Sequence, residues 1–354
     1  MLYSLKNEEK KYEKKEDLQK ILKYLENNQE TIKELDLSSN VFLPDAMAEL
    51  CKYIKKIKNL KTIILDGIFT TLTKEEMLEC FKLISLSITG KDIILLDLSN
   101  NALSSELPIE FINLLSNLNS LKFLNIRNCG LGKKGGDIIG ECFVNLKTKD
   151  NLEYLDIAQN RFFVFPEKLI LGINSLKNLN VLKLEYNTIE KITMTKALEI
   201  LKNHPLEILD IRDNFLNIEG CKILGEIFAT WNIRELYMGD CLCQNEGILE
   251  FIKNANKKFT SMNLPGDCKE DNDIVLDISY NDWEQDCVEE LTDFCDKYNI
   301  KKLIITGNFY EDESQLNKVM REYGGELVSQ EEENEEEKKG EVDETLISML
   351  KNIH

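Results

Sequence analysis

The sequence has few of the residues from which catalytic and metal sites are usually built. It contains two histidines, His204 before Pro205 and His354 at its end, and neither is placed as a general base. The ten cysteines show no CxxC pair and no Cys/His spacing of the kind that binds zinc, so we expect reduced thiols and no metal. The motifs of phosphate-binding loops, serine nucleophiles, zinc proteases and dinucleotide sites are also missing. These absences predict that the chain is not itself an enzyme and holds no cofactor.

Long apolar runs and positive charge are scarce too. No stretch approaches the roughly 18 apolar residues of a membrane span, and the opening residues MLYSLKNEEKKYEKK have no apolar core of a secretory signal. Lys and Arg number 44 against 63 Asp and Glu, which gives a net charge of −19. Such a field repels the phosphates of nucleic acid and suits a basic protein partner. We therefore expect a cytoplasmic protein that binds neither membrane nor nucleic acid.

What the sequence does have is a phrase that returns along its length. The phrase reads leucine-type, two residues, leucine-type, one residue, leucine-type, two residues, and then Asn or Cys. It appears as IKELDLSSN from Ile32, LKFLNIRNC from Leu121, LEYLDIAQN from Leu152 and LEILDIRDN from Leu206. This is the pattern of a leucine-rich repeat, in which each unit is a short strand, a turn and a helix. The predicted fold is an α/β horseshoe with a parallel sheet on the concave face and helices on the convex face.

Each position in the nine-residue phrase predicts an orientation. Positions 1, 4 and 6 point into the core, and position 9 turns inward, where its side chain can hydrogen-bond backbone groups that leave the sheet. Positions 5, 7 and 8 face solvent on the concave surface and its rim, so any binding function must use them. Position 9 is held by Asn40, Asn101, Asn160, Asn187, Asn214, Asn281 and Asn308, and by Cys129 and Cys241.

Three regions are predicted along the chain. Residues 1–31, which contain apolar residues at helical spacing in EDLQKILKYLEN, form an N-terminal helical cap. Residues 32–326 form the leucine-rich repeat domain, with a polar insertion at KKFTSMNLPGDCKEDND that we interpret as a surface loop. Residues 327–354 form an acidic tail that we expect to be disordered, because ten acidic residues and two lysines between Glu326 and Glu344 give a net charge of −8. The tail either keeps the protein soluble or attracts a basic patch on a partner.

One copy of the phrase is more specific than the others. The stretch RNCGLGKKGGDIIGECF, from Arg127, resembles the Asn-X-Gly-Leu-Gly loop and following helix of Ran GTPase-activating proteins. DGIFTTLTKEE, from Asp66, resembles that family's second-repeat loop, and IRELYMGDCLC, from Ile233, resembles a late family repeat with its Asp-Cys pair. The array followed at once by an acidic tail agrees as well, so the resemblance covers nearly the whole chain.

The resemblance implies that the chain stimulates GTP hydrolysis by a Ran-like small GTPase in its GTP-bound form and so supports nucleocytoplasmic transport. It also implies a Ran-binding protein as a further partner. The family acts without an arginine finger: an exposed asparagine positions the GTPase's own catalytic glutamine, and the matching residue is Asn128. Position analysis agrees, since Asn128 holds the exposed position 8 and Cys129 the buried position 9. A turn residue with no further role is the alternative interpretation of Asn128.

Further contacts are predicted on the same surface. Lys74 matches a basic residue of the family's second-repeat loop, whereas Leu72 stands where family members tend to have an arginine, which would remove one charged contact. Position 8 of other repeats supplies the remaining candidates. The predicted partner-binding residues are Lys74, Asn100, Arg127, Gln159, Tyr186, Asp213 and Asp240.

Two other functions stay open on the sequence alone. The chain could be a non-catalytic scaffold or inhibitor that binds a basic protein through its concave face, although such a protein has no reason to keep the Asn128 loop. It could also be an adaptor for ubiquitination, but no F-box-like helical segment is recognisable before Ile32. The cluster Gly130, Gly132, Gly135 and Gly136 does not follow a phosphate-binding pattern, and it predicts a tight loop within a repeat.

Overall fold

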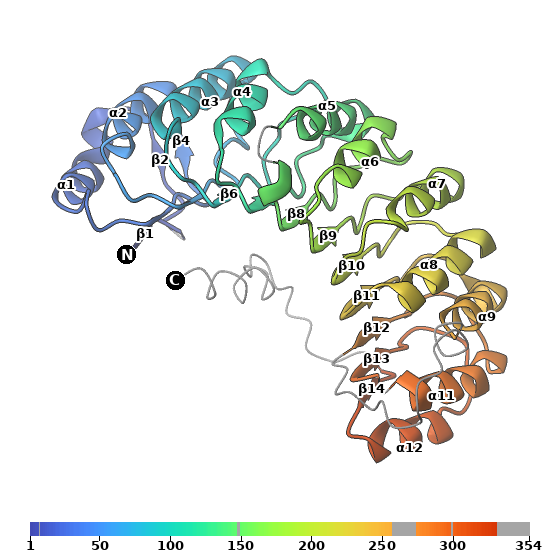
Figure 1. Cartoon of the computed structure of the whole chain (residues 1–354). Coiled ribbons are helices and arrows are strands. Elements are labelled where there is room, and N and C mark those ends of the chain that lie inside the picture. The colour runs from blue at the N-terminus through green and yellow to red at the C-terminus, as the bar shows by residue number, and fades with distance from the viewer. Residues whose placement is uncertain (7, 147–148, 257–273, 299, 331–354) are drawn as a thin grey trace.

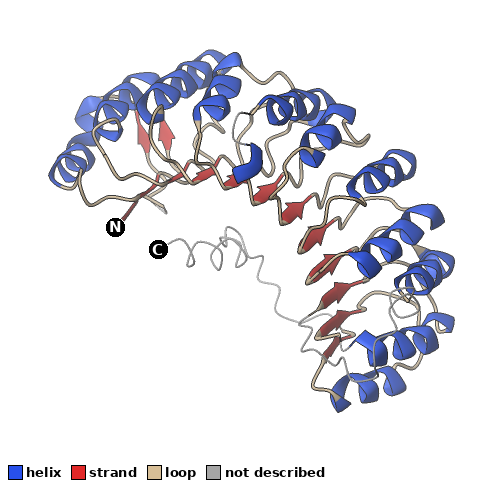
Figure 2. Ribbon diagram, in the orientation of Figure 1, coloured by secondary structure: helices blue, strands red, loops and turns tan. Residues whose placement is uncertain are grey.

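The chain forms one curved array of strand–helix units (Figure 1). The computed structural model describes residues 1–6, 8–146, 149–256, 274–298 and 300–330. Strands line the inner edge of the arc and helices its outer edge (Figure 2), so the predicted α/β horseshoe is confirmed. The predicted polar insertion, at 257–273, and most of the predicted acidic tail, at 331–354, lie outside the described residues.

Within the described residues, a parallel sheet of 12 strands forms the concave face. Each strand is three residues long and pairs in register with its neighbours, so that Phe123 lies between Leu95 and Tyr154. Because the register is constant, a given position of the phrase forms a row that runs along the arc. The strands are β1 (Leu2–Ser4), β3 (Glu34–Asp36), β5 (Thr62–Ile64), β6 (Leu95–Asp97), β7 (Phe123–Asn125), β8 (Tyr154–Asp156), β9 (Val181–Lys183), β10 (Ile208–Asp210), β11 (Glu235–Tyr237), β12 (Val275–Asp277), β13 (Lys302–Ile304) and β14 (Glu326–Val328). A second, two-stranded sheet pairs β2 (Lys11–Tyr12) with β4 (Val41–Phe42).

The helices cover the outer face of the sheet and bury the apolar residues whose spacing predicts them. α8 (Ile218–Thr230), for example, buries Leu224, Ile227 and Phe228. These side chains meet the inward strand residues in one continuous core. The other helical segments are η1 (Lys15–Leu18), α1 (Gln19–Asn27), α2 (Pro44–Ile54), α3 (Lys74–Ile88), α4 (Ile109–Asn117), α5 (Gly132–Asn145), η2 (Lys149–Asn151), α6 (Glu167–Asn174), α7 (Lys191–Leu201), α9 (Gln244–Ala255), α11 (Asp286–Tyr298) and α12 (Ser314–Glu322).

Glycines let two pairs of neighbouring helices touch backbone to backbone. A Cβ on Gly140 of α5 would lie 2.1 Å from the carbonyl oxygen of Lys168, and one on Gly172 of α6 would lie 2.6 Å from that of Gly140. Gly225 of α8 meets α9 in the same way, with a Cβ only 2.3 Å from the carbonyl oxygen of Phe251. Both contacts therefore require glycine.

The sheet extends beyond the predicted repeat domain at both ends. β1 lies within the region predicted as a helical cap and pairs with β3, and the amide of Leu5 donates to the carbonyl of Asp36 at 2.8 Å. β14 lies across the predicted boundary at 326 and pairs with β13. Strand pairing uses only backbone groups, so an end strand adds to the sheet without carrying the leucine phrase. The phrase therefore underestimates the length of the array.

Candidate functional site

The residues at position 9 form a buried polar row behind the strand ends. Asn160, which is fully buried, accepts from the amide of Cys129 at 3.0 Å and donates through Nδ2 to the carbonyls of Ile126 and Ile157 at 2.9 and 3.0 Å. Cys129 replaces asparagine in its own repeat and places Sγ 3.2 Å from the carbonyl oxygen of Leu98. These contacts satisfy backbone groups that leave the sheet, so position 9 is structural, as predicted.

The residues at position 8 form a second row, which we call the rim. All of them have a positive φ, between 50° and 73°: Ser39, Gly67, Asn100, Asn128, Gln159, Tyr186, Asp213, Asp240, Tyr280 and Gly307. From Ser39 to Tyr280, their amides donate to the carbonyl at position 7 of the next repeat, as Asn128 does to Ala158 at 3.0 Å. Because Ser, Gln, Tyr and Asp adopt the same left-handed conformation, the fold does not require asparagine at 128.

Asn128 belongs to a chain of hydrogen bonds that runs along the rim. Its Nδ2 donates to Oδ1 of Asn100 at 2.9 Å, and Nδ2 of Asn100 donates to Oδ1 of Asp66 at 2.8 Å. Asp66 is a carboxylate and can only accept, so it fixes which end of the Asn100 amide faces it. The Asn100 oxygen then faces Asn128, and the Asn128 amide nitrogen faces Asn100. Oδ1 of Asn128, to which no described residue donates, is left as the acceptor.

Arg127 is held away from solvent beside this chain. Its guanidinium forms an ion pair with Glu185 and lies 3.9 Å from a carboxylate oxygen of Asp156. It also lies 5.8 Å from the ring centroid of Tyr186. The small side chain of Ala158 stands between the two repeats that Arg127 connects. Arg127, next to Asn128, therefore stabilises the packing between repeats. Its side chain is only 28% exposed, which restricts the contact with a partner that the sequence predicts for it.

Three charged side chains connect the helix ends of repeats near Asn128. Glu106 accepts from Lys134 at 2.9 Å and from Lys74 at 3.4 Å, which holds the predicted contact Lys74 on the surface. Leu72, at the position where the resemblance would place an arginine, packs partly buried against the core. In the second-repeat loop, Leu72 therefore stabilises the fold through an apolar contact, and Lys74 places one ammonium group on the surface.

Positions 5 and 7 were predicted to face solvent, and for most repeats this is wrong. Asp97, Asp156, Asp210, Asp277 and Glu185 are all less than a tenth exposed. Neighbouring strands lie about 4.8 Å apart, so side chains of adjacent repeats cover one another. Many of these carboxylates also turn toward the backbone: Asp97 accepts from the amide of Ser99 at 2.8 Å. Burial raises the pKa of Asp97 to about 6.

An apolar row at position 3 completes this cover of the concave face. Leu95, Phe123, Tyr154, Val181 and Ile208 form a buried cluster separate from the main core. The phrase leaves position 3 unspecified, so this cluster could be found only by aligning the repeats and comparing that column. It leaves the rim as the part of the inner surface where polar side chains are most exposed.

The rim has two chemically different halves. Its first half carries the amides Asn100, Asn128 and Gln159, of which Asn100 and Gln159 are exposed and Asn128 half-buried. Its second half carries Tyr186, Asp213, Asp240 and Tyr280, of which only Asp213 is half-buried. The predicted contact residues at position 8 are thus brought into one continuous row.

One charged residue just beyond the rim is missed by the sequence prediction. Arg161 is exposed, has a φ of 58° and lies two residues beyond Gln159, one repeat along from Asn128. The leucine phrase ends at position 9, so it gives no reason to single out a residue at position 10 or to compare it with its equivalents in other repeats. Its charge on an otherwise neutral part of the rim is the signal that would have found it.

The glycines after Asn128 serve the loop and its helix. Gly130 and Gly132 have φ values of 66° and 54°, a conformation that glycine adopts without strain. A Cβ on Gly136 would lie 2.5 Å from Cγ of Pro166. The predicted tight loop is therefore correct for Gly130, whereas Gly132, Gly135 and Gly136 belong to α5, where Gly136 allows close packing against Pro166.

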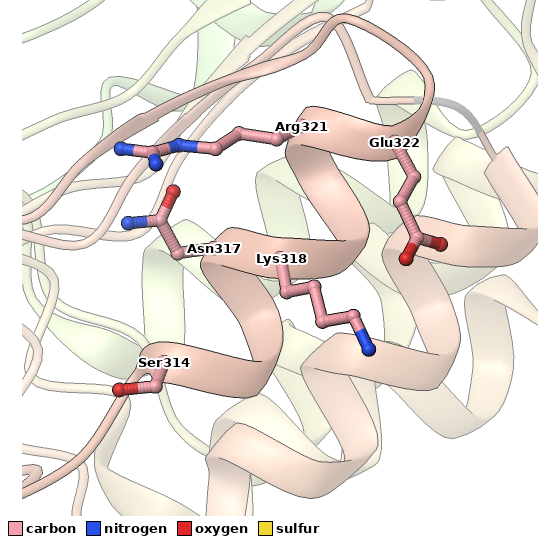
Figure 3. Close-up of a pocket in the computed structure, with 5 residues that line it drawn as sticks. All are labelled: Ser314, Asn317, Lys318, Arg321 and Glu322. Atoms are coloured by element: carbon pink, nitrogen blue, oxygen red, sulfur yellow. The ribbon is translucent and has the colours of Figure 1, made fainter.

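The cysteine thiols and a depression on helix α12 can also be considered as sites. The thiols of the described residues are buried, and burial raises the pKa of Cys51 and Cys80 to about 12, so both are protonated at neutral pH. A depression of about 430 Å³ on α12 is lined by Ser314, Asn317, Lys318, Arg321 and Glu322. Figure 3 shows Asn317 and Arg321 together on one side of the helix and Lys318 with Glu322 on the other.

None of the helices in the described part of the chain has both the length and the apolar character needed to cross a bilayer.

Comparison with known proteins identifies the repeat and one relative of interest. A family model described as Leucine Rich Repeat matches residues 92–114. A Ran GTPase-activating protein of Drosophila melanogaster is 26% identical over 216 residues, which cover 60% of this chain and 33% of that protein. A FERM domain-containing protein C of Dictyostelium discoideum is 28% identical over 139 residues, or 38% of this chain and 9% of that protein. The chain thus spans a third or less of the curated relatives it matches.

Two solved structures align with the chain at lower sequence identity. An internalin from Listeria monocytogenes aligns over 90% of this chain and 77% of its own, with 15% identity and a TM-score of 0.47. Human 5T4, the trophoblast glycoprotein, aligns over 74% of this chain and 76% of its own, with 17% identity and a TM-score of 0.38.

Proposed function

We propose that this protein stimulates GTP hydrolysis by a Ran-like small GTPase and that Asn128 positions the GTPase's catalytic glutamine. The observation that carries the proposal is the hydrogen-bond chain from Asp66 through Asn100, which leaves Oδ1 of Asn128 as the acceptor. A glutamine side chain carries an amide NH₂ that can donate to this oxygen. Its own oxygen would then be held toward the attacking water. Phosphoryl transfer depends mainly on such positioning and on electrostatics.

The surroundings of Asn128 suit this role. Arg127 is turned toward Glu185, Asp156 and the ring of Tyr186, so the residue beside Asn128 is not extended as an arginine finger. Lys74, held by Glu106, provides a cation on the same edge of the array. The similarity to a Drosophila protein named for activation of the Ran GTPase supports the choice of partner. The activity would support nucleocytoplasmic transport from the cytoplasm and would need no metal or nucleotide pocket on this chain.

A single-turnover assay tests the proposal directly. The GTPase is loaded with radiolabelled GTP, and phosphate release is followed with and without this protein. We expect stimulation, and we expect Asn128→Ala to reduce it by about a hundredfold. Asn119→Ala is the matched control. Asn119 is likewise an asparagine and is exposed, but it lies in the loop that leads from helix α4 to strand β7, whereas Asn128 lies in a loop that leads from a strand to a helix. No stimulation by the unaltered protein would reject the proposed function. Stimulation unaffected by Asn128→Ala would reject the role of Asn128.

A non-catalytic scaffold or inhibitor is the second candidate. The observation in its favour is the net charge of −19, which would attract a basic protein whatever its activity. A GTPase activator binds the GTP-loaded form of its partner in preference to the GDP-loaded form. Pull-down of the GTPase in both states separates the candidates, since equal recovery of the two forms would favour the scaffold.

A further inference from the structure

A groove lies beside the second half of the rim, several repeats away from Asn128, and Leu242 in its lining follows the rim residue Asp240 by two positions. It has a volume of about 350 Å³ and is formed by the loop after β11 and the first turns of α7, α8 and α9. Leu216 and Cys243 are its buried residues, while Ile218 and Leu242 are 49% and 36% exposed. Glu219 and Glu246 stand beside them. Lys191 also lines the groove, so its apolar side chains stand within a border of mixed charge that holds two carboxylates and one ammonium group.

Leu242 combines a left-handed backbone with an exposed apolar side chain. Its φ of 54° recurs at the equivalent position of other repeats, as at Arg161 and Thr188, so the conformation belongs to the repeat and not to Leu242 alone. What is particular to position 242 is that this turn carries a large apolar side chain that the fold does not bury. Exposed apolar side chains beside a groove are found where a surface binds a partner.

A row of acidic and aromatic side chains runs past the groove. Tyr186, Asp213, Asp240 and Tyr280 hold position 8 in four successive repeats, and each amide donates to the next repeat, as Asp213 does to Gly239 at 3.1 Å. Burial and the neighbouring Asp240 raise the pKa of Asp213. Among the residues that the structure describes, no lysine or arginine forms a salt bridge with either aspartate. Two adjacent carboxylates suit a cationic side chain, whereas the ring of Tyr186 already has Arg127 at 5.8 Å from its centroid.

We propose that this half of the rim binds a protein segment in which Lys or Arg stands beside apolar residues. The cationic group lies against Asp213 and Asp240, and an apolar side chain enters the groove between Ile218 and Leu242. Charge complementarity decides the occupant. A second copy of this chain, with its net charge of −19, would place carboxylates against carboxylates. The inference does not rest on the activity proposed above, because the segment is tested as an isolated peptide.

The probe is a fluorescent synthetic peptide that carries Lys and Leu at helical spacing. Two companions replace its Lys by Glu or its Leu by Ser, and binding to the full chain is measured by fluorescence anisotropy at physiological salt. We expect one binding site for the first peptide and loss of binding for both companions. Failure of the first peptide to bind, or equal binding of the Ser companion, would overturn the proposal.

Two pairs of variants locate the site. Leu242→Gly with Ile218→Ala removes the apolar contacts, and glycine relieves the left-handed backbone at 242, so the variant remains folded while its affinity falls about tenfold. Asp213→Asn with Asp240→Asn removes two charges from the rim and lowers the affinity by about the same factor. Glu290→Gln with Asp293→Asn removes the same charge from exposed positions of α11 and serves as the control.

The affinities of the three paired variants for the peptide are then compared. The control pair is expected to change the affinity by less than about twofold, because distant surface charges are screened. If the control weakens binding as much as the rim aspartates do, the peptide senses only net charge and the proposal fails. It fails equally if the apolar pair, confirmed as folded by thermal unfolding, leaves the affinity unchanged.

Discussion

Arg127 pairs with Glu185, a residue two repeats further along the array, and passes the small side chain of Ala158 to reach it. The contact fixes the strand ends of three successive repeats beside Asn128. Glu185 is 3% exposed, and one of its two carboxylate oxygens has no hydrogen-bond partner. The pair is therefore a buried ionic contact whose contribution depends on the protonation of Glu185.

Replacing Arg127 should cost more stability at high pH than at low pH. Burial, with Asp210 and Asp156 nearby, raises the pKa of Glu185 to about 8, while Arg127 acts to lower it. The attraction is thus present above that pKa and is lost as the pH falls below it. Arg127→Met should lower the free energy of unfolding by about 3 kcal/mol near pH 9 and by clearly less near pH 6. Urea unfolding at both values measures this, with exposed Arg321→Met as the control. An equal loss at both values would contradict the assignment.

The hydrogen-bond chain to Asn128 should be visible in kinetics. Asp66→Ala releases the Asn100 amide, which can then rotate and no longer orients Asn128, so the single-turnover rate of the GTPase should fall about tenfold. In an Asn128→Ala background the same change should have little further effect, because the group it orients is gone. Ser39→Ala, at position 8 of the first repeat, is the control. Additive effects of the two substitutions would show that Asp66 acts independently of Asn128.

Arg161 separates a binding role from a catalytic one. Its exposed guanidinium lies one repeat from Asn128, where it can contact the acidic or phosphate groups of a partner. We expect Arg161→Ala to raise KM about tenfold and to change kcat little, as for a contact equally present before and during the reaction. A fall in kcat of about a thousandfold would instead identify Arg161 as an arginine finger and would contradict the mechanism proposed for Asn128.

Asp97 should make the fold less stable as the pH rises. Burial raises its pKa to about 6 in the folded chain, against about 3.9 in an unfolded one. Between these values the folded state binds more protons, so the free energy of unfolding falls with rising pH by up to about 3 kcal/mol. Asp97→Asn removes that part of the slope, which lies between about pH 4 and pH 6. Exposed Asp293→Asn should leave the slope of the parent. An unchanged slope in Asp97→Asn would show that the buried carboxyl is ionised throughout.

The sequence predicts those features that repeat within a single phrase. Asn160 and Cys129 face inward because the chain must satisfy backbone groups at every strand end, and that need recurs in each unit. Asn128 lies on the rim for the same reason. The class of the fold and the row that holds the candidate site follow directly from this periodicity.

Features that depend on the packing of one repeat against another could not be read from the phrase. Whether Asp97 is exposed depends on its neighbours in the adjacent strands, and the reach of Arg127 to Glu185 depends on the small side chain at 158. β1 and β14 join the sheet through backbone groups and so leave no side-chain signature. The direction of the Asn128 amide is set by Asp66, which lies two repeats earlier in the chain.

The glycine contacts between α5 and α6 and between α8 and α9 also bear on how the arc responds to force. Curvature arises because helices take more room than strands, so a pair of helices in backbone contact locally straightens the array. Such a pair has no flexible side chains between its helices that can be compressed. The arc is therefore expected to behave as stiff segments, Gly140 to Gly172 and Gly225 to Phe251, joined by more compliant ones. Between them lies α7, where a bound partner would most easily widen or narrow the horseshoe.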